Sequence, residues 1–467
     1  MIRSDFSFEK IRDDTYLITN YAGRYAFLSG DEFTAFCKGN DLNPDTRQKL
    51  IESYFCADAS SEQFMVEYSN AIRNYRNYLF SGTSLHIFVL TTQCNLKCVY
   101  CQASTHDKGN MMSFETAEKS VDLALQSPSS CLSFEFQGGE PLENFDVMKH
   151  IVEYTERNAL DKSVDFNLVS NLTLMNDEIA NFIKEHNINI STSLDGDELL
   201  QNINRPFPGK NGYEIWKTNY RKVRELLGHS CGAIQTTTRK SLDRYKEIVD
   251  EYIDNGFNRV FLRPLTPLGY AATRWEAIGY TANEFIGFYR KAFEYILEKC
   301  KNGYNIAKGH ACIFLDKLIN HRAGNYTELT SPCGAALGQL AYNYDGNIYT
   351  CDEGRMMAEM GDQTFRLGTV DMKYSELFDS PVCKLVANAS CLEFIPQCES
   401  CVFSPYCGTC PVLNHYENKS VFPVEPNGYK CKIYRGILET LFSKLLDGTN
   451  EEKEILRSWV QDNTTDC

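Results

Sequence analysis

The chain has 467 residues, of which 43% are hydrophobic and 23% are charged, so it is long enough for two or three domains around a large buried core. Its net charge of −15 argues against non-specific binding to nucleic acid or to an anionic membrane. No apolar run approaches the roughly 20 residues of a membrane-spanning helix, and the N-terminus lacks the apolar stretch of a secretory signal. We therefore expect a cytoplasmic protein.

Residues 1–80 are predicted to form a small module of strands and helices. The stretch "TYLITNYAGRYAFLS" indicates two short strands around a turn at residues 21–23, which is typical of a hairpin. The stretches "GDEFTAFCKG" and "TRQKLIESYF" that follow have helical periodicity. We expect an α+β module in front of the main domain.

Strand-like runs then alternate with helical stretches from residue 84 to residue 270. Six such β-α units in succession predict a parallel sheet with right-handed crossovers. Polar or glycine-rich residues follow the strands, at the end of a parallel sheet where binding and catalytic groups gather. The expected strands are LHIFVLT (85–91), LSFEFQ (132–137), DFNLVS (165–170), INISTSL (188–194), GAIQTTT (232–238) and RVFLRPL (259–265).

Nineteen cysteines are the strongest signal in the composition. The cytosol keeps thiols reduced, so clustered cysteines there indicate metal or iron–sulfur ligands. One group lies at residues 94–101 and a second lies in the loop-rich segment between residues 333 and 431, before a last helix and a polar tail. We divide the chain into 1–80, 81–300, 301–445 and the tail 446–467.

The first group lies in "TTQCNLKCVYCQAS", where Cys94, Cys98 and Cys101 follow the first expected strand. A structural zinc site needs four closed ligands, whereas three thiolates on one loop suit a [4Fe–4S] cluster with one iron left open. An open iron can chelate a small molecule through an amine and a carboxylate. A zinc loop with a distant fourth ligand is the alternative.

This motif resembles that of the radical S-adenosylmethionine (radical SAM) enzymes. The resemblance implies a partial (β/α)6 TIM-like barrel, in which Cys94, Cys98 and Cys101 hold a [4Fe–4S] cluster that binds SAM. It also implies that one electron, from a donor such as flavodoxin or ferredoxin, cleaves SAM to methionine and a 5′-deoxyadenosyl radical. That radical abstracts hydrogen from a substrate.

The same resemblance assigns SAM-binding residues at successive strand ends. The family's "GGEP" segment meets the SAM amino group, and glycines there allow the backbone to approach a ligand closely. The ends of the next two strands line the ribose and the carboxylate, and an arginine meets the carboxylate. The residues carried over are Tyr100, Gly138, Gly139, Glu140, Asn171, Ser193, Asp195 and Arg205.

The second cysteine region resembles the SPASM extension of radical SAM peptide-modifying enzymes. It has "CGAALGQLAYNYDGNIYTC" and "CESCVFSPYCGTCP", but the last gap is two residues where the family has three. The resemblance implies two auxiliary [4Fe–4S] clusters, while paired cysteines equally suit structural zinc. The outer cluster would use Cys398, Cys401, Cys407 and Cys431, and the inner one Cys333, Cys351 and Cys410, with Cys312 or a non-cysteine group as a fourth ligand.

Asp352 directly follows a proposed ligand in "TCDEG". In some SPASM enzymes an acid at this position acts as a base, and a carboxylate there could take the proton released when a substrate radical is oxidised. The alternative is a carboxylate that caps a turn or pairs with Arg355.

The whole chain also resembles the maturases of the His-Xaa-Ser peptide system, through cues such as "FEFQGGEPLENF", "DEGRMMAE" and "PYCGTCP". This implies a ribosomally made precursor peptide as substrate and a thioether or carbon–carbon crosslink as product. Residues 1–80 would then hold the leader as an added strand, or only cap the barrel. The competing functions are an anaerobic sulfatase-maturing enzyme and a non-catalytic protein that binds a partner through zinc knuckles.

Overall fold

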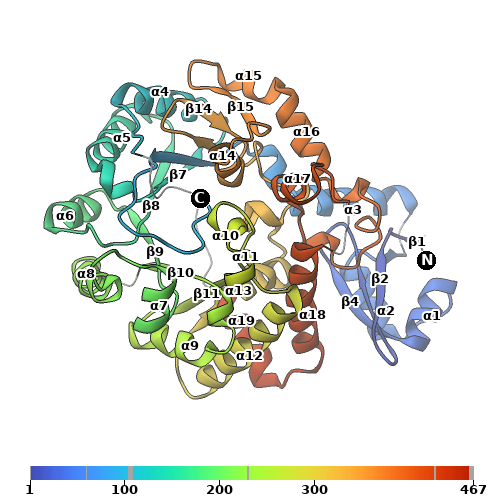
Figure 1. Cartoon of the computed structure of the whole chain (residues 1–467). Helices are drawn as coiled ribbons and strands as arrows, with labels where there is room; N and C mark the ends of the chain where they lie inside the picture. The colour runs from blue at the N-terminus through green and yellow to red at the C-terminus, as the bar shows by residue number, and fades with distance from the viewer. Residues whose placement is uncertain (1, 59, 104–108, 229–230, 425–427, 462–467) are drawn as a thin grey trace. The chain divides into compact units, whose positions relative to one another are not determined.

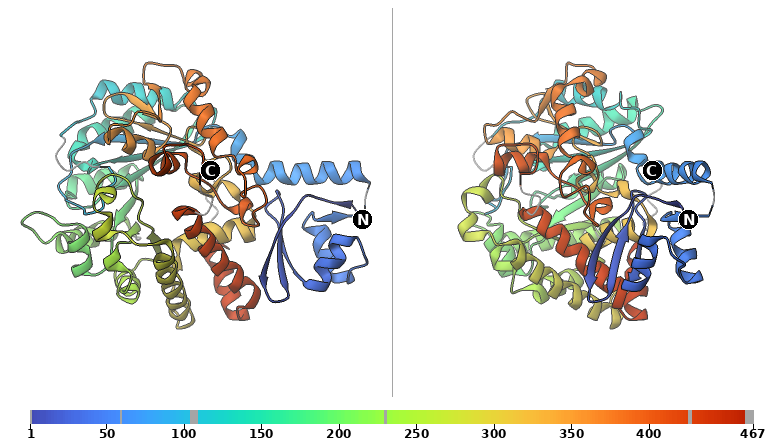
Figure 2. Two further views of the ribbon diagram at one scale, coloured as in Figure 1. Left: turned by 45° about the vertical axis from the view of Figure 1, so that its right-hand side comes forward. Right: turned by 90° about the vertical axis from the view of Figure 1, so that its right-hand side faces the viewer.

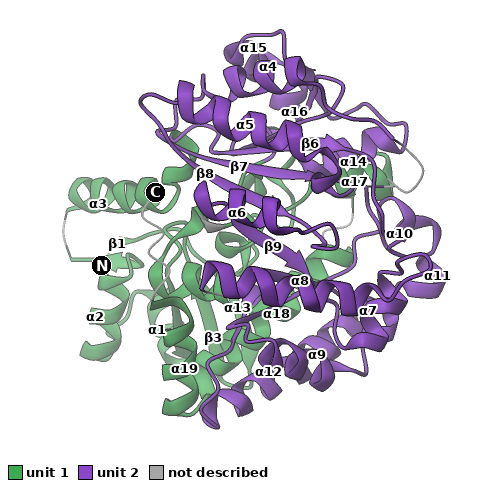
Figure 3. Ribbon diagram, turned by 90° about the vertical axis from the view of Figure 1, so that its left-hand side faces the viewer, with its two compact units in different colours: residues 1–80, 311–334, 388–463 green, residues 81–310, 335–387, 464–467 purple. Residues whose placement is uncertain are grey.

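The computed structural model describes residues 2–58, 60–103, 109–228, 231–424 and 428–461. The chain forms two compact units (Figure 3). The first unit comprises residues 1–80, 311–334 and 388–463, and the barrel unit comprises residues 81–310, 335–387 and 464–467. The segment expected as one cysteine-rich domain, 301–445, is therefore shared between the two units.

All six predicted strands of the main domain are present, and they lie side by side in sequence order as one parallel sheet (Figure 1). Helices between them cover the outside of the sheet, which is the partial-barrel architecture predicted from the sequence. The strands are β6 (Leu85–Thr91), β7 (Cys131–Gly138), β8 (Ser163–Val169), β9 (Asn189–Ser193), β10 (Gly232–Thr236) and β11 (Arg259–Arg263). The main helices of the crossovers are α4 (Phe114–Ala124), α5 (Phe145–Asn158), α6 (Asp177–Glu185), α7 (Glu198–Asn204), α8 (Gly212–Leu227) and α9 (Tyr245–Asp254), followed by α12 (Ala282–Lys301).

The strands present two chemically different faces. In β7 the even-numbered residues, such as Phe134 and Phe136, are buried, whereas the odd-numbered Ser133, Glu135 and Gln137 are partly exposed. In an α/β barrel the helices cover the outward face of the strands, and alternate residues point inward. The inner face of β7 is therefore polar.

Three short strands extend the sheet beyond β6 and are absent from the sequence prediction. β13 (Gln339–Tyr342) pairs in parallel with β6, and β14 (Asn347–Tyr349) and β15 (Arg366–Thr369) continue antiparallel. Ile87, Val89, Ala341 and Tyr349 form a buried cluster across this junction. The strand pairing and this cluster explain why residues 335–387 belong to the barrel unit and not to the cysteine-rich remainder. The short elements of this unit are β12 (Ala307–Lys308), α10 (Tyr270–Thr273), α11 (Trp275–Ile278), α14 (Asp352–Glu359), α15 (Tyr374–Asp379) and α16 (Pro381–Ala389).

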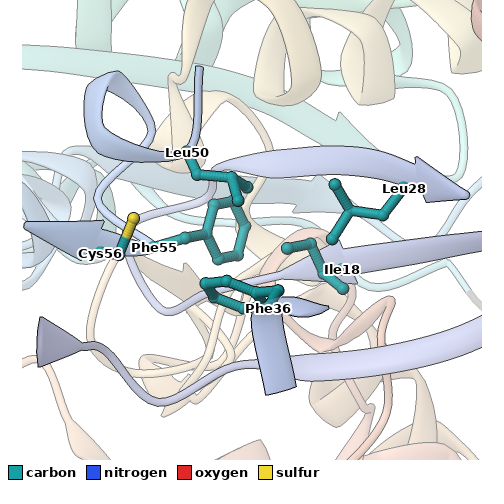
Figure 4. Packing of buried hydrophobic residues seen from close by; sticks show 6 residues of the cluster. All are labelled: Ile18, Leu28, Phe36, Leu50, Phe55 and Cys56. Carbon is teal, nitrogen blue, oxygen red and sulfur yellow. The ribbon is translucent and has the colours of Figure 1, made fainter. Parts of the chain in front are cut away.

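The first unit begins with an antiparallel sheet of β2 (Ser7–Arg12), β3 (Thr15–Thr19) and β4 (Tyr25–Ser29). The predicted hairpin is confirmed as β3 and β4, while β2 had been missed. Behind one face lie α1 (Gly30–Lys38) and α2 (Pro44–Glu52), whose side chains meet the sheet in a small apolar core (Figure 4). That core contains Ile18, Leu28, Phe36, Leu50, Phe55 and Cys56. The short strands β1 (Ile2–Arg3) and β5 (Cys56–Ala57) pair with each other, and α3 (Ser61–Tyr75) follows.

The opposite face of this sheet packs on a C-terminal helix. Phe442 of α18 (Tyr429–Asp447) contacts the rings of Tyr25 and Phe27, and the red helix runs beside the blue strands in both views of Figure 2. Residues 446–467 were predicted to be a polar tail. In the structure Asn450–Gln461 forms the helix α19, in which Leu456 and Val460 are buried. Two further helices of this unit are α13 (Gly309–Leu315), which begins at the boundary, and α17 (Pro411–Asn418).

Within the described ranges, no helix has both the length and the apolar character to cross a membrane.

We predict that Phe36→Ala destabilises the N-terminal sheet. Phe36 is fully buried, so truncation removes apolar contacts and leaves a cavity, which costs about 3–5 kcal/mol. Native-state hydrogen exchange of the β3 and β4 amides should report a lower opening free energy by that amount. Phe80→Ala is the control, because Phe80 is 71% exposed and its loss should change the value by less than about 0.5 kcal/mol. Equal effects of the two substitutions would contradict the assignment of this core.

Candidate functional site

The loop with Cys94, Cys98 and Cys101 follows β6 and is held in place by its backbone. The amides of Lys97 and Val99 donate to the carbonyls of Pro206 and Asn204, each at 2.9 Å. These bonds tie the cysteine loop to the segment that follows α7, where Arg205 lies. These hydrogen bonds join segments that are more than one hundred positions apart. The spacing of the motifs in the sequence does not predict such a contact.

Two thiols of this loop, those of Cys94 and Cys98, lie where burial disfavours their ionisation. Burial raises the pKa of Cys98 to about 12 and also raises the pKa of Cys94, with further contributions from neighbouring thiols and carboxylates. Buried thiols become thiolates when a cationic centre compensates the charge. No group of three or more His, Cys, Asp or Glu side chains in the described ranges lies close enough to hold one metal ion. A cluster spreads its ligands over several irons, so three thiols on one loop, one buried and two partly buried, fit it.

A buried network connects three of the predicted SAM-binding residues. The Tyr100 hydroxyl donates to Asp195 Oδ2 at 2.8 Å and accepts from Arg205 Nη1 at 2.9 Å. Asp195 is fully buried and also accepts from the amide of Thr236. Burial raises the pKa of Asp195, and the Arg205 guanidinium opposes that shift. The sequence prediction brought these residues to one site, but it did not foresee that they bind one another.

One atom of this network is left available for a ligand. Among the described residues, Arg205 Nε is buried and has no hydrogen-bond partner. Buried donors are normally satisfied, so an acceptor is expected there. A carboxylate such as that of SAM has the right charge and geometry to accept this bond.

Glu140 is 1% exposed and is surrounded by donors. Its carboxylate accepts from the Ser170 hydroxyl at 2.7 Å and from the amides of Asn171 and Leu142 at 2.8 and 3.2 Å. Burial raises its pKa to about 7, although these bonds oppose the shift. Glu140 therefore joins the ends of β7 and β8, and its role as an acceptor for an ammonium group stays a prediction.

Asn171 also acts within the chain. Its side-chain amide donates to Asn95 Oδ1 of the cysteine loop at 3.0 Å, and its carbonyl oxygen accepts from Thr173. The Asn95 amide in turn donates to the Thr173 hydroxyl at 2.8 Å. Asn95 and Thr173 were missed in the sequence analysis, and only their polar character beside the motifs could have indicated them.

The two glycines of "GGEP" pack against the chain's own backbone, and their role toward SAM stays a prediction. A Cβ on Gly138 or Gly139 would collide with the backbone of Thr91 or Gln93. The amides of Gly139 and Glu140 donate to the carbonyls of Thr91 and Gln93, each at 2.8 Å. The close backbone approach that requires glycine is thus to the chain itself, beside the cysteine loop.

Ser193 ends β9, and its carbonyl accepts from the side chain of Gln201 at 3.1 Å. Glu135 lies on the inner face of β7, opposite Ile87 and Asn167 in the strand register, and was missed in the sequence analysis. Burial raises the pKa of Glu135, and the charges of Asp352 and Arg263 also act on it. The signal available for Glu135 was an acidic residue inside an otherwise apolar strand.

Asp352 is the first residue of α14 and forms an ion pair with the fully buried Arg355. This is the alternative stated for Asp352 above. The next residue, Glu353, lies 3.7 Å from Arg263 at the end of β11. The start of α14 therefore carries charged side chains toward the strand that closes the partial barrel. The catalytic role of Asp352 stays a prediction.

The second cysteine region surrounds one cavity of about 190 Å³ in the first unit. The cavity is lined by Cys398, Cys401, Cys407, Cys410 and Cys431. Burial raises the pKa of Cys398 to about 12, and the neighbouring thiols Cys401 and Cys431 add to the shift. The pKa values of Cys407 and Cys431 are raised in the same way by the charges of other thiols in this set. The four residues predicted for the outer cluster therefore lie close to one another. Their number and their shared cavity fit a four-thiolate cluster.

Cationic side chains lie around this cavity. Lys317 is buried and donates to the carbonyl of Leu329 at 2.9 Å, and its charge interacts with Cys407. Lys430 lies within electrostatic reach of Cys410, and Arg435 acts on Cys401. Such charges offset the negative charge that bound thiolates would bring into a buried site.

The residues predicted for the inner cluster are distributed over both units. Cys333 and Cys410 lie in the first unit, as does Cys312, while Cys351 lies in the barrel unit. Cys333 and Cys351 are both buried. The Cys351 sulfur accepts from the amide of Gly354 at 3.3 Å and caps α14.

Comparison with known proteins agrees with the motif analysis. Residues 88–234 match the family model described as Radical SAM superfamily. An uncharacterized protein of Methanocaldococcus jannaschii is 32% identical over 40% of this chain, which spans 65% of that relative's length. A cysteine-type anaerobic sulfatase-maturating enzyme of Clostridium novyi is 25% identical, over 78% of this chain and 96% of its own.

Solved structures share the fold at low sequence identity. The structure "Native anSMEcpe with bound AdoMet and Kp18Cys peptide" has a TM-score of 0.65 at 19% identity and covers 80% of this chain and 99% of its own. The structure of Streptococcus suis SuiB bound to precursor peptide SuiA has a TM-score of 0.54 at 17% identity and covers 90% of this chain and 97% of its own. Both show the architecture of SPASM-type radical SAM maturases. The narrower His-Xaa-Ser resemblance stays a prediction.

We predict that Tyr100→Phe weakens SAM binding about tenfold in the reconstituted protein. The substitution keeps the ring but removes the hydroxyl that joins Asp195 and Arg205, and a lost charge-linked hydrogen bond costs about 1–3 kcal/mol. Equilibrium dialysis with labelled SAM measures the change. Tyr154→Phe is the matched control, since its hydroxyl donates to Asp122 at the surface, at 3.0 Å. Unchanged SAM affinity in Tyr100→Phe would contradict the positioning role.

We also predict that Cys407→Ala lowers the iron content of anaerobically reconstituted protein by about four per chain, because one [4Fe–4S] cluster loses a ligand. Cys383→Ala should leave the iron content unchanged, because Cys383 is buried and is not among the thiols that line the cavity. Iron and sulfide analysis gives both values. Zinc in place of iron at this cavity would contradict the auxiliary-cluster assignment.

Three cysteines on one loop, polar residues at successive strand ends and the partial barrel coincide with the matched segment at residues 88–234. The fold, the motif and the family match require the same cofactors, a [4Fe–4S] cluster and SAM. Residues 88–234 of the chain form a radical SAM domain.

Proposed function

We propose that this enzyme modifies a residue of a ribosomally synthesised precursor peptide in the cytoplasm and forms a thioether or a carbon–carbon crosslink. The observation that carries the proposal is the combination of the radical SAM domain with a second cysteine-lined cavity in the first unit. The fold shared with SuiB over 90% of the chain supports a peptide substrate. An electron donor such as flavodoxin or ferredoxin is required.

The chain's own residues would divide the work as follows. Cys94, Cys98 and Cys101 would hold the SAM-binding cluster, and Arg205 would bind the carboxylate of SAM. When bound, these cofactors supply a 5′-deoxyadenosyl radical, which removes a hydrogen atom from the substrate. The polar inner face of β7, with Glu135, would hold the target residue in reach.

Crosslink formation removes a second hydrogen as a proton and an electron. Asp352 would accept the proton, since its carboxylate lies at the start of α14, where it forms an ion pair with Arg355. Two auxiliary clusters, held by the predicted sets with Cys407 and Cys351, would accept the electron or position the peptide.

Residues 1–80 would bind the leader of the precursor. Their sheet has three strands in the order β2-β3-β4, so its outer strands have an edge without a strand partner in that sheet. Extended peptides bind such edges by adding a strand. The alternative is that residues 1–80 only cap the barrel and bind no peptide.

Maturation of a sulfatase is the second candidate. The Clostridium novyi relative with that name is 25% identical over 78% of this chain, and Asp352 suits a base in either reaction. That enzyme class oxidises a Cys or Ser side chain to an aldehyde, so the product is a single altered residue and no crosslink.

The test is anaerobic reconstitution followed by an assay for 5′-deoxyadenosine with dithionite. Three clusters predict about twelve irons per chain, and replacing Cys94, Cys98 and Cys101 by Ala should abolish SAM cleavage and remove about four irons. Retained cleavage would contradict the central assignment. Four irons with bound zinc would instead favour the reading with zinc knuckles in the second region.

Mass spectrometry of a candidate peptide after coexpression separates the two enzymatic functions. The precursor would be encoded by a small open reading frame next to the gene. Loss of about two mass units with resistance to thiol alkylation indicates a thioether, and the same loss with neither that resistance nor an aldehyde indicates a carbon–carbon crosslink. An aldehyde that reacts with hydrazines indicates a formylglycine.

A further inference from the structure

Arg355 is a charged side chain in the interior of the barrel unit. The residue is 0% exposed and lies in α14. Its guanidinium uses Nη2 for the ion pair with Asp352. Among the described residues, Arg355 Nε and Nη1 have no hydrogen-bond partner. These two nitrogens carry three of the five N–H donors of a guanidinium, so most of its donors lack an acceptor.

Such donors at a buried arginine are rare, because each of them has lost its hydrogen bond to water. The nearby carboxylates have other partners. Glu353 lies 3.7 Å from Arg263, and Glu135 on the inner face of β7 accepts from Gln137. The free donors of Arg355 therefore indicate an anionic acceptor that is added to the chain, either a cofactor or a substrate.

Arg355 lies one helical turn after Cys351, which was predicted to bind the inner auxiliary cluster. The amide of Arg355 donates to the carbonyl of Cys351 at 3.1 Å. Cys351 is itself buried, and its sulfur accepts from the amide of Gly354 at 3.3 Å. Side chains of a helix lean toward its N-terminus, and the contact with Asp352 shows that Arg355 does so. The free donors therefore belong to a side chain that leans toward the turn capped by Cys351.

The first turn of α14 closes tightly over this cysteine. A Cβ on Gly354 would lie 2.9 Å from Thr350 Oγ1 and 3.7 Å from the sulfur of Cys351. No side chain of another residue type therefore fits at this position without a shift of its neighbours. The N-terminus of a helix also carries partial positive charge. The thiol of Cys351 thus lies in a compact and positively polarised turn.

An iron–sulfur cluster bound at Cys351 fits the free donors better than a substrate does. A cluster with its thiolates is anionic, and its sulfurs accept hydrogen bonds. The cluster stays beside its ligand, whereas a substrate carboxylate has to enter from solvent. Arg355 has no exposed surface through which such a group could reach it.

We propose that Arg355 donates hydrogen bonds from Nε and Nη1 to the sulfurs of the auxiliary cluster bound at Cys351 and thereby raises the reduction potential of that cluster. Positive charge and hydrogen bonds stabilise the reduced form, which carries one more negative charge. The ion pair with Asp352 holds the guanidinium in place. The inference rests on the proposed function, in which the substrate radical gives one electron to an auxiliary cluster and the matching proton to a base. Arg355 acts on the electron alone.

A redox titration followed by electron paramagnetic resonance tests this role in the full-length, anaerobically reconstituted protein. In every sample the three cysteines within residues 94–101 are replaced by Ala, so that only auxiliary clusters contribute. The further change Cys351→Ala identifies the signal of the inner cluster. We expect Arg355→Gln to lower the midpoint potential of that signal by at least about 59 mV, which is a tenfold change in a one-electron equilibrium. The second auxiliary signal should not change.

Two further variants separate the donors from charge and from folding. Arg366→Gln removes the same charge from an exposed residue of β15, and it should change the reduction equilibrium less than twofold. Arg355→Lys keeps the charge but not the planar pair of donors, so its potential should lie between those of the parent and Arg355→Gln. If Arg355→Gln assembles no inner cluster, an unchanged potential in Arg355→Lys overturns the proposal. An equal shift in Arg355→Gln and Arg366→Gln overturns it as well.

Iron content separates this inference from the proposed function. Two auxiliary clusters give about eight irons per chain in these samples. Eight irons with an unchanged potential in Arg355→Gln would overturn the role of Arg355 and leave both auxiliary clusters in place. If Cys351→Ala removes neither iron nor a signal, the cluster assignment of the proposed function fails, and the inference fails with it.

Discussion

The structure depends on holding a loop of three thiols beside a partly buried arginine. Backbone bonds from Lys97 and Val99 to residues 204–206 place Arg205 next to Tyr100, and Asp195 neutralises the guanidinium. A charged group removed from water is stable only when its partners are fixed. The same bonds that satisfy Arg205 therefore join the first strand of the barrel to the helix after the fourth. The carboxylate of Glu140 makes a similar link between the second and third strands. The polar side chains of the cofactor site thus hold one another in position through hydrogen bonds. Few of their atoms, such as Arg205 Nε, remain for a ligand.

In the second cysteine region, different groups would stabilise the charge of the thiolates. Its thiols line a cavity together with Lys430, and the charges of Lys317 and Arg435 act on Cys407 and Cys401. Lys317 is held by backbone carbonyls, and burial lowers its pKa to about 7. The charges of Cys407 and Asp316 oppose this shift, so negative charge at these residues stabilises the ammonium form of Lys317.

Much of this could be predicted from the sequence, because local patterns carry it. The six strands of the barrel are short apolar or alternating runs followed by polar residues, and each one is present in the structure. The division of the chain could not be predicted, since β13 joins the barrel through parallel pairing with β6, a contact between residues some 250 positions apart. For the same reason the network of Asn95, Asn171 and Thr173 was missed, because it is formed across strand ends. The glycines of "GGEP" were located correctly, but their neighbour is the chain's own backbone, which only three-dimensional packing reveals.

The alternation within β7 explains how one strand can serve both stability and chemistry. Phe134 and Phe136 face the apolar layer, where Phe134 packs on Phe88 with ring centroids 4.9 Å apart. On the opposite face Glu135 keeps a partly exposed carboxylate whose pKa is raised by burial. Because side chains alternate strictly along a strand, a substitution at an odd position of β7 alters the inner surface without disturbing the core behind it. Enzymes on this scaffold can therefore acquire new substrates through the inner residues of the strands while the cofactor loop and the outer packing stay unchanged. In this chain, Glu135 occupies such a position.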